Sequence, residues 1–371
     1  MNFAFSEEQE ELRRYVRQWM NERMPLSRVR QLMETPDGYE RADWAAVAEM
    51  GWQAMAIPEE YGGAGFGLLE LAVLTEEQGR GLFCGPFLST VVASANALLI
   101  AGSETQKADY LPRIAAGELV VALAVTETSS GYDAEHMTTS AARTDAGWTI
   151  DGSKRFVVDG HSADLLVVAA QTADGPGLFL VDASAEGVTR SRLEALDQTR
   201  PQAEISFDGV TVGEDARLPG SGVGALARIN DIVATMLAVE AVGGAQATLD
   251  MAVQYAKDRQ QFGKPIGSFQ AIKHMCADML VDVEAARAAA YYAAWCVATE
   301  SDETPTVVPL AKAYCTDAFF RCASSNIQVH GGIGFTWEHD AHMYFKRAKS
   351  SQVMFGSPDE RRKQLAERLG F

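Results

Sequence analysis

The spacing of apolar and polar residues changes twice along the chain and divides it into three regions. Residues 6–119 carry apolar side chains at the three-to-four-residue intervals of amphipathic helices. Ser6 precedes the first helical stretch and its glutamates, so it is expected to be the N-cap of that helix. Further helices are predicted over 67–80 and 89–102, after a Pro/Gly turn at 58–63 that a helix cannot accommodate.

The middle region, residues 120–212, has the two-residue period of strands. Its runs are short, rich in β-branched residues, and separated by Gly, Asp and Ser. The pattern predicts strands over 120–127, 148–158, 164–171, 177–183 and 203–212. No GxGxxG motif joins one of these strands to a helix, so a Rossmann domain is excluded and an antiparallel sheet or small barrel is favoured.

The helical period returns near residue 225 and continues to the end of the chain. It predicts helices over 225–260, 269–299 and 305–329, with a shorter one closing the chain. Long, Ala-rich helices of this kind pack closely in antiparallel bundles. The predicted fold class is therefore α+β, with an N-terminal helical domain (1–118), a middle antiparallel β-sheet domain (119–220) and a C-terminal helical bundle (221–371).

Composition and charge narrow the class of protein without indicating a reaction. The chain has 32 Lys and Arg against 50 Asp and Glu, a formal net charge of -18. This charge repels phosphate backbones, so we expect no nucleic-acid partner. A hydrophobic fraction of 47% excludes a disordered chain. No uninterrupted apolar run approaches the roughly 20 residues of a membrane span, and the N-terminus lacks a signal-peptide pattern, so we expect no membrane span.

Cysteine and histidine spacings suggest neither a disulfide framework nor a metal site. The five cysteines are odd in number and contain no CxxC pair. This usage fits a reducing compartment, and we expect a cytoplasmic protein whose cysteines act as small buried apolar groups. None of the six histidines lies in a metal-binding spacing, so no metal is predicted.

Four motifs carry a resemblance to a known family. They are IPEEYGGAG at 57–65, VTETSSGYD at 125–133, DRQQFGKPIGSFQ at 258–270 and QVHGGIGFTWEHD at 328–340. In order and spacing the chain resembles the FAD-dependent acyl-CoA dehydrogenase superfamily over essentially its whole length. The resemblance implies a C-terminal four-helix bundle and the α,β-dehydrogenation of an acyl-CoA thioester. In that reaction a carboxylate removes the α-proton while the β-carbon delivers a hydride to FAD.

The family positions that bind the adenine and diphosphate end of FAD, across a subunit interface, are filled here. They correspond to Arg259, Phe262, Gln328, Gly331 and Gly332. An arginine offers a planar cationic fork to phosphate, and paired glycines let the backbone approach a ligand closely. The alternative is that the arginine is a helix-end cation and the glycine pair a C-cap.

The positions expected to bind the flavin ring are altered. Thr126 is kept, but Tyr132 replaces a small serine and Val158 replaces the threonine that hydrogen-bonds the flavin in the family. Valine has no donor for that bond, and tyrosine fills space where a diphosphate would lie. The flavin side of the site is therefore expected to be degraded.

Neither usual position of the catalytic base holds a carboxylate. Counting without a gap from the glycine pair places Phe355 where many family members have glutamate. The other family position of the base lies on the long helix and corresponds to Val233. The next position, where the family has an arginine, is occupied by Ala234. Glu240, two helical turns after Val233, is an alternative base. It is equally a candidate for a buried glutamate paired with an arginine, the backbone or a partner subunit.

The resemblance implies a division of labour, because one half of the cofactor site is kept and the other half is lost. Some actinobacterial acyl-CoA dehydrogenases are α2β2 heterotetramers with one FAD per heterodimer that act on steroid side-chain CoA esters. We interpret this chain as the subunit of such an enzyme that lacks the base. A homologous partner would then supply the glutamate, and an electron-accepting flavoprotein would reoxidise FAD.

Two alternatives remain: a self-sufficient homo-oligomer using Glu240, and a flavin-free scaffold. Apolar and aromatic faces over 285–300 and 333–348 suit subunit packing or the chain's own core.

Overall fold

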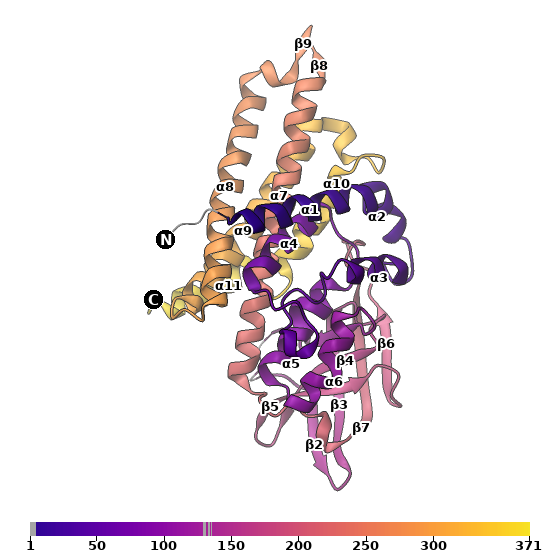
Figure 1. Cartoon of the computed structure of the whole chain (residues 1–371). Helices are drawn as coiled ribbons and strands as arrows, with labels where there is room; N and C mark the ends of the chain where they lie inside the picture. Colours follow the sequence, from indigo (N-terminus) through magenta and orange to yellow (C-terminus); the bar gives the residue numbers. More distant parts are fainter. Residues whose placement is uncertain (1–4, 129–130, 133, 135) are drawn as a thin grey trace. The chain divides into compact units, whose positions relative to one another are not determined.

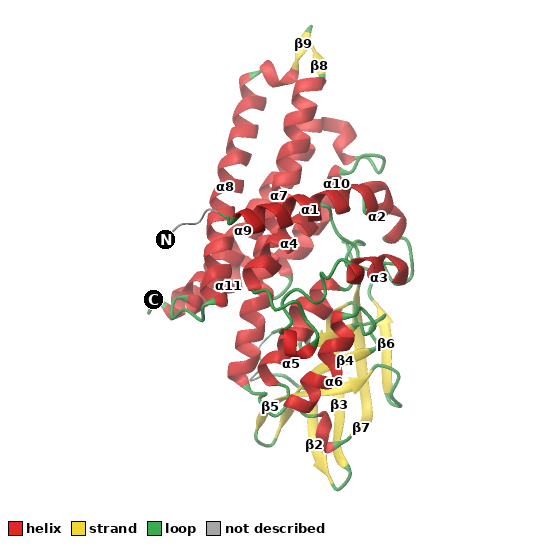
Figure 2. Cartoon of the chain, viewed as in Figure 1, coloured by secondary structure: helices red, strands yellow, loops and turns green. Residues whose placement is uncertain are grey.

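The computed structural model describes residues 5–128, 131–132, 134 and 136–371 (Figures 1 and 2). It divides into two compact units. The bundle unit comprises Met1–Gln31, Leu68–Phe83 and Ala234–Phe371, and the sheet unit comprises Leu32–Gly67 and Cys84–Val233. The helices of the predicted N-terminal domain are shared between the two units.

The bundle unit is helical. Its elements are α1 (Glu7–Arg23), α4 (Leu68–Arg80), α7 (Val223–Asp258, from Ala234), β8 (Gln260–Gln261), β9 (Lys264–Pro265), η4 (Ile266–Ser268), α8 (Gln270–Ala298), α9 (Thr304–His330), η5 (Gly331–Phe335), α10 (Ala341–Val353) and α11 (Pro358–Arg368). Helix α2 (Leu26–Leu32) begins in this unit. Helix α8 packs along α9, and α9 also contacts α10 and α11 (Figure 1). The three long helices match the predicted ones, but the single closing helix is in fact two helices joined by a turn.

Local capping explains where helices begin. Ser6 Oγ accepts a hydrogen bond from the backbone N–H of Gln9 at 3.2 Å, and Gln9 Oε1 accepts one from the Ser6 N–H at 3.1 Å. This reciprocal capping box satisfies two donors that the first helical turn leaves without partners. The predicted N-cap at Ser6 is confirmed.

Two glycines let α4 and α7 approach closely. A Cβ added at Gly243 would lie 1.8 Å from the Glu76 carbonyl oxygen, and one at Gly79 would lie 2.1 Å from the Glu240 carbonyl oxygen. The crossing is therefore a contact between backbones, which only residues without a side chain permit. It places Glu76 and Glu77 of α4 beside a cluster of arginines.

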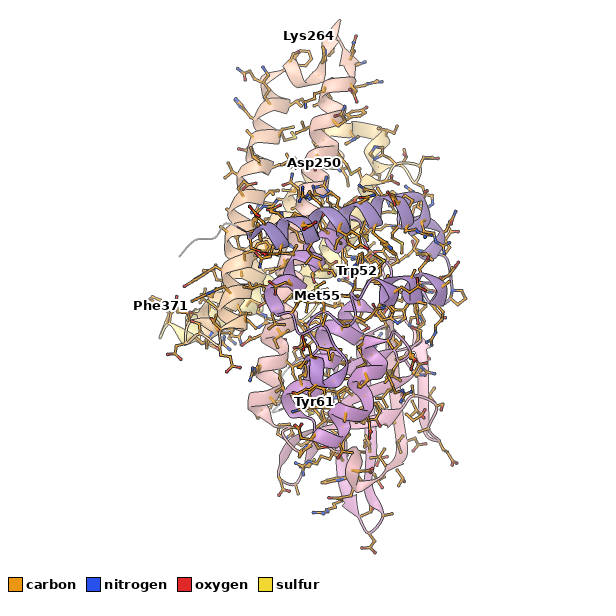
Figure 3. All side chains as sticks on the ribbon, viewed as in Figure 1. Trp52, Met55, Tyr61, Asp250, Lys264 and Phe371 are labelled. Atoms are coloured by element: carbon orange, nitrogen blue, oxygen red, sulfur yellow. The ribbon has the colours of Figure 1, made fainter. Side chains whose placement is uncertain are left out.

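Those arginines neutralise both carboxylates. Glu76 accepts hydrogen bonds from Arg13 at 3.0 Å and from the Tyr291 hydroxyl at 2.6 Å, and it also pairs with Arg287. Glu77 accepts two from Arg17, at 2.7 and 2.8 Å. Arg80 pairs with Asp250 of α7, which Figure 3 labels. This network joins α1, α4, α7 and α8.

Helix α7 is more apolar than the search for uninterrupted runs indicated. By length and hydropathy it could cross a membrane. However, 94% of its most apolar 18-residue window is buried in the protein, as in the core helix of a globular fold. Its apolar character is therefore accounted for by packing.

The sheet unit contains the seven-stranded sheet and several short helices (Figure 2). The helical elements are α3 (Arg41–Glu49), η1 (Glu59–Tyr61), the π-helical η2 (Leu88–Ser94), α5 (Ala95–Ala101), α6 (Glu104–Ala115) and η3 (Glu214–Ala216). The strands are β1 (Val121–Ala124), β2 (Ser140–Thr144), β3 (Gly147–Val158), β4 (Leu165–Thr172), β5 (Gly175–Asp182), β6 (Val188–Arg192) and β7 (Gln202–Val212).

The predicted middle β domain is present, but its sheet is mixed, whereas the sequence predicted an antiparallel sheet or small barrel. The order is β1-β4-β2-β3-β7-β6, with β5 beside β4. Strands β1 and β2 pair with β4 in parallel, and the remaining pairs are antiparallel. Strands β2 and β6 were not predicted because most of their residues are exposed and they lack an apolar alternation.

The glycine crossing yields a stability prediction. Gly243→Ala should destabilise the protein by about 3 kcal/mol or more, because the added methyl group must displace the α4 backbone. Gly224→Ala, on the same helix but with nothing within 4 Å, is the matched control and should be neutral or slightly stabilising. Urea unfolding of both variants tests the contact, and equal stabilities would contradict it.

Candidate functional site

The five residues expected at the adenine and diphosphate end of FAD lie at one end of the bundle unit. Arg259 directly follows α7 and opens the β8–β9 hairpin, whose tip is marked by Lys264 in Figure 3. Gln328 lies in the last turn of α9, and Gly331 and Gly332 open η5. The ends of α7 and α9 touch, because the rings of Tyr255 and His330 stack with centroids 4.2 Å apart.

All five residues are accessible to a ligand or to another chain. Arg259, Gln328, Gly331 and Gly332 are exposed, and the Phe262 side chain is 91% exposed. Gly331 has φ 65°, and a Cβ at either glycine would meet nothing within 4 Å. Phe262 itself has φ 53°, a strained conformation, and its ring meets that of Phe269 edge to face with centroids 6.0 Å apart.

The chemistry of this group fits the adenine and diphosphate end of FAD. A guanidinium can bind phosphate oxygens through two parallel hydrogen bonds, and open glycine backbone can donate further ones. An exposed aromatic ring offers a stacking surface for a purine. Together these residues have the chemistry that one half of a dinucleotide site requires.

The first position at which the resemblance places the base lies in a strained turn between α10 and α11. Phe355 has φ 51° and is buried, and its carbonyl oxygen accepts hydrogen bonds from the guanidinium of Arg361, one of them at 3.1 Å. Lys312, fully buried, donates to the carbonyl oxygens of Ser351 at 2.8 Å and Gly356 at 3.3 Å. Burial lowers the pKa of Lys312 to about 7. Two buried basic side chains, Lys312 and Arg361, therefore hold the turn. The side chain that the turn presents, Phe355, has no group that could accept a proton.

The second base position is also inert. Val233 and Ala234 are completely buried in α7 and carry no polar side-chain atom. Neither can remove a proton from a substrate.

Glu240 is held in a buried ion pair. Its Oε1 lies 2.6 Å from Nη1 of Arg347 on α10, with the two side chains only 6% and 2% exposed. Nη2 of Arg347 also donates to the Phe83 carbonyl oxygen at 3.4 Å. A carboxylate in such a pair is stabilised in its charged form and makes a weak base. The geometry matches the structural alternative for Glu240.

The residues expected at the flavin ring lie in the sheet unit. Thr126 is buried just after β1, and its carbonyl oxygen accepts the Arg155 N–H at 2.8 Å. Val158 is buried at the end of β3, with no side-chain donor. Ser129, Ser130 and Asp133 of the same motif lie outside the described residues. Among the described residues of this region, Val158 has no side-chain donor for the hydrogen bond that the resemblance implies to the flavin ring.

Glu127, the neighbour of Thr126, is committed to the fold. Burial raises its pKa, but hydrogen bonds from Lys154, Thr138 and Thr139 outweigh this and lower the pKa to about 2. Lys154 Nζ lies 2.7 Å from Glu127 Oε1, and both side chains are almost fully buried. Glu127 therefore anchors the end of β1 to β3 and is no candidate for the base.

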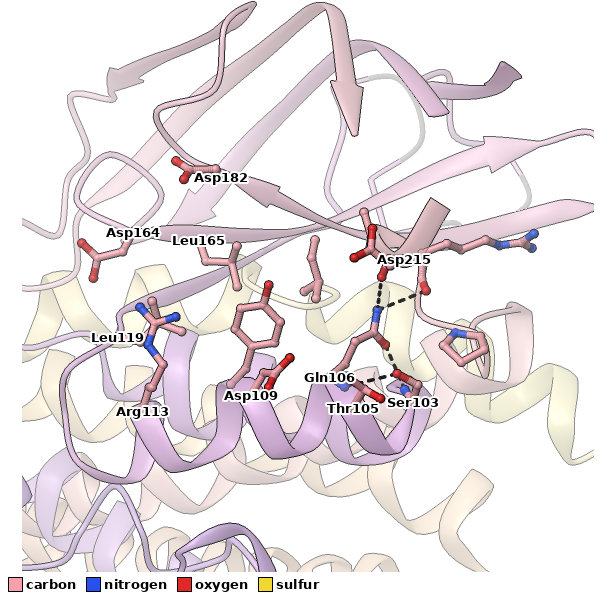
Figure 4. Close-up of a pocket in the computed structure, with 15 residues that line it drawn as sticks. Ser103, Thr105, Gln106, Asp109, Arg113, Leu119, Asp164, Leu165, Asp182 and Asp215 are labelled. Carbon is pink, nitrogen blue, oxygen red and sulfur yellow. Dashed lines mark hydrogen bonds between the residues drawn. The ribbon is translucent and has the colours of Figure 1, made fainter. Parts of the chain in front are cut away.

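A polar cavity of about 650 Å³ lies in the sheet unit, between α6 and the β4–β5 strands (Figure 4). Gln106 closes one end by donating to the carbonyl oxygens of Asp215 at 2.7 Å and Arg217 at 3.2 Å. No residue predicted to bind cofactor lines it. Among the described residues, no group of three or more His, Cys, Asp or Glu could hold a metal ion.

Comparison with known sequences defines the class of protein. Profiles of the N-terminal, middle and C-terminal domains of acyl-CoA dehydrogenase match residues 6–118, 122–210 and 221–370. The chain belongs to the acyl-CoA dehydrogenase family, whose cofactor is FAD.

The chain is also similar to particular members of this family. It is 34% identical to acyl-CoA dehydrogenase IpdE2 of Mycolicibacterium smegmatis, over 97% of this chain and 98% of that protein. It resembles a chain of the ChsE4–ChsE5 complex of Mycobacterium tuberculosis, with a TM-score of 0.92, 27% identity and coverage of 100% and 99%. A chain of the steroid ACAD Tcur3481–Tcur3483 gives a TM-score of 0.89 and 31% identity, with 98% coverage of both chains.

The ion pair of Glu240 yields a second stability prediction. Arg347→Met should destabilise the protein by about 3–5 kcal/mol, because a buried carboxylate loses its cationic partner. Glu240→Leu combined with Arg347→Met removes both charges and should recover most of the loss. Urea unfolding of the single and double variants measures the coupling, and additive losses would contradict a structural pair.

Proposed function

We propose that this chain is the base-lacking subunit of a heteromeric, FAD-dependent acyl-CoA dehydrogenase. It contributes the adenine and diphosphate half-site, and a homologous partner supplies the catalytic glutamate. The observation that carries the proposal is the contrast between two sites of the bundle unit. The half-site at Arg259 and Gly331 is open and chemically intact, whereas the base turn presents Phe355.

The residues of this chain have binding roles in the proposal. Arg259 binds the diphosphate, the backbone N–H groups at Gly331 and Gly332 add hydrogen bonds, and Phe262 stacks on the adenine. Gln328 is placed to hydrogen-bond the same end. The redox chemistry, acceptance of a hydride from the substrate β-carbon, is supplied by FAD. Proton abstraction is assigned to the partner, since Glu240 is already paired with Arg347.

Exposed apolar side chains beside the half-site support assembly with a second chain. Phe335 is 81% exposed, Trp337 50% and Ile333 48%, and all three lie within nine residues of Gln328. Aromatic groups exposed together are typical of surfaces that become buried against a partner. The names ChsE4–ChsE5 and Tcur3481–Tcur3483, each joining two chains, support a heteromer.

The substrate class that we propose is a steroid side-chain CoA ester, supported by the description of Tcur3481–Tcur3483 as a steroid ACAD. The assembly proposed is α2β2, with one FAD for each pair of unlike chains and a flavoprotein as electron acceptor. The location that we propose is the cytoplasm, where cysteines that form no disulfide, as here, stay reduced.

The half-site makes the proposal testable. In the co-expressed complex, Arg259→Ala should weaken FAD binding about 10- to 100-fold, because one charge-assisted hydrogen-bonding group is lost. Arg14→Ala, an exposed arginine on α1, is the matched control and should leave binding unchanged. Titration of the apo-complex with FAD, followed by flavin fluorescence, gives both affinities.

Two results would contradict the proposal. Unchanged FAD affinity in Arg259→Ala would favour a flavin-free scaffold. An isolated chain that binds FAD and turns over an acyl-CoA would favour a self-sufficient enzyme, and loss of that activity in Glu240→Gln would then assign the base.

A further inference from the structure

Three neighbouring rings, those of Tyr255, His330 and His339, lie at the proposed half-site and are called the ring stack below. His330 ends α9, immediately before Gly331. The Tyr255 ring stacks on it with centroids 4.2 Å apart, and the His339 ring lies 4.3 Å away at a tilt of 50°. Tyr255 is one helical turn before Arg259, so this stack connects the glycine turn to the arginine. His330 is only 7% exposed. It contacts the end of α7 through Tyr255, and nearby Asn326 of α9 also contacts Met251 of α7.

The hydrogen bonding of His330 favours the neutral imidazole. Nδ1 lies 2.8 Å from the carbonyl oxygen of Asn326, so Nδ1 carries the proton and Nε2 needs none. His339 accepts the Ala341 N–H at Nδ1, at 3.1 Å. The groups that face His330 are thus the Tyr255 phenol ring from α7, the Asn326 carbonyl from α9 and the His339 imidazole from the segment after η5. Among the described residues no carboxylate forms an ion pair with His330.

A proton on His330 would therefore introduce a buried charge without an acidic partner. Burial lowers the pKa of His330, more than its bond to the Asn326 carbonyl raises it, and His339 lowers it further. The neutral, stacked form is fully favoured above the ordinary histidine value of about 6.5. The stabilisation that the neutral, stacked form contributes is lost as the pH falls through the lowered pKa of His330. This is because a His330 ring that has left the ring stack binds the proton more readily.

We infer that His330 is a positioning residue of the half-site, and that FAD binding by the complex weakens in acid because protonated His330 leaves the ring stack. When the stack opens, the Gly331–Gly332 turn is no longer held against the end of α7. Arg259 and the glycine backbone then no longer bind the same diphosphate together. This inference rests on the proposed function, since it assumes that the chain contributes this half-site to FAD.

The experiment compares FAD affinities of the co-expressed complex at pH 7.5 and 5.5, by fluorescence titration of the apo-complex. The wild-type complex should bind FAD about tenfold more weakly at pH 5.5. This is the change in affinity expected when uptake of one proton opposes FAD binding over about one pH unit. His330→Phe keeps a flat ring in the stack but cannot take a proton. Because phenylalanine cannot donate to the Asn326 carbonyl oxygen, this variant should bind FAD more weakly than the wild type at pH 7.5, with no further weakening at pH 5.5. His330→Ala removes the ring and should bind weakly at both pH values.

The possible results distinguish failure of the inference about His330 from failure of the proposed function. Wild-type affinity that is equal or tighter at pH 5.5 overturns the inference, and so does a His330→Phe complex that keeps the full pH dependence. Normal affinity in His330→Ala also overturns it. A wild-type complex that takes up no FAD at pH 7.5 overturns the proposed function and the inference with it.

Discussion

The close approach of α4 to α7 at Gly79 and Gly243 is the contact on which the bundle unit depends. Because two backbones touch there, α4 brings Glu76 and Glu77 to the arginines of α1 and α8. The same contact includes the backbone of Glu240, whose side chain reaches Arg347 on α10. One pair of glycines therefore sets the positions of five helices.

Burial explains why several carboxylates of this acidic chain are paired with cations. A carboxylate removed from water must be paired, and the buried Glu76, Glu127 and Glu240 each have a cationic partner. The turn that carries the base in the family remains folded, because Lys312 and Arg361 bind its carbonyl groups whatever side chain it presents. In the proposed subunit, Phe355 stands where a glutamate is expected, and the hydrogen bonds to the turn do not depend on that side chain.

The sequence predicted the elements with strong periodicity and missed those without it. The long helices and the Ser6 cap follow from local patterns, but alternation along a strand indicates its faces and not its direction, so the parallel β1–β4 pairing was not foreseen. The partner of Glu240 lies 107 residues away, beyond any local pattern. The family motifs predicted that Arg259 and Gly331 belong to one site, which stays a prediction. The stack of Tyr255 on His330 was missed, although a tyrosine one turn before the arginine and a histidine beside the glycine pair were its signals.

The central claim is a division of labour between two chains, and the flavin content of the purified complex tests it most directly. Absorbance of the flavin band, measured against the protein concentration, gives the number of FAD molecules per chain. The account predicts one FAD for each pair of unlike chains, and none for this chain alone. One FAD for every chain, or a stoichiometric flavin in the isolated chain, would contradict it.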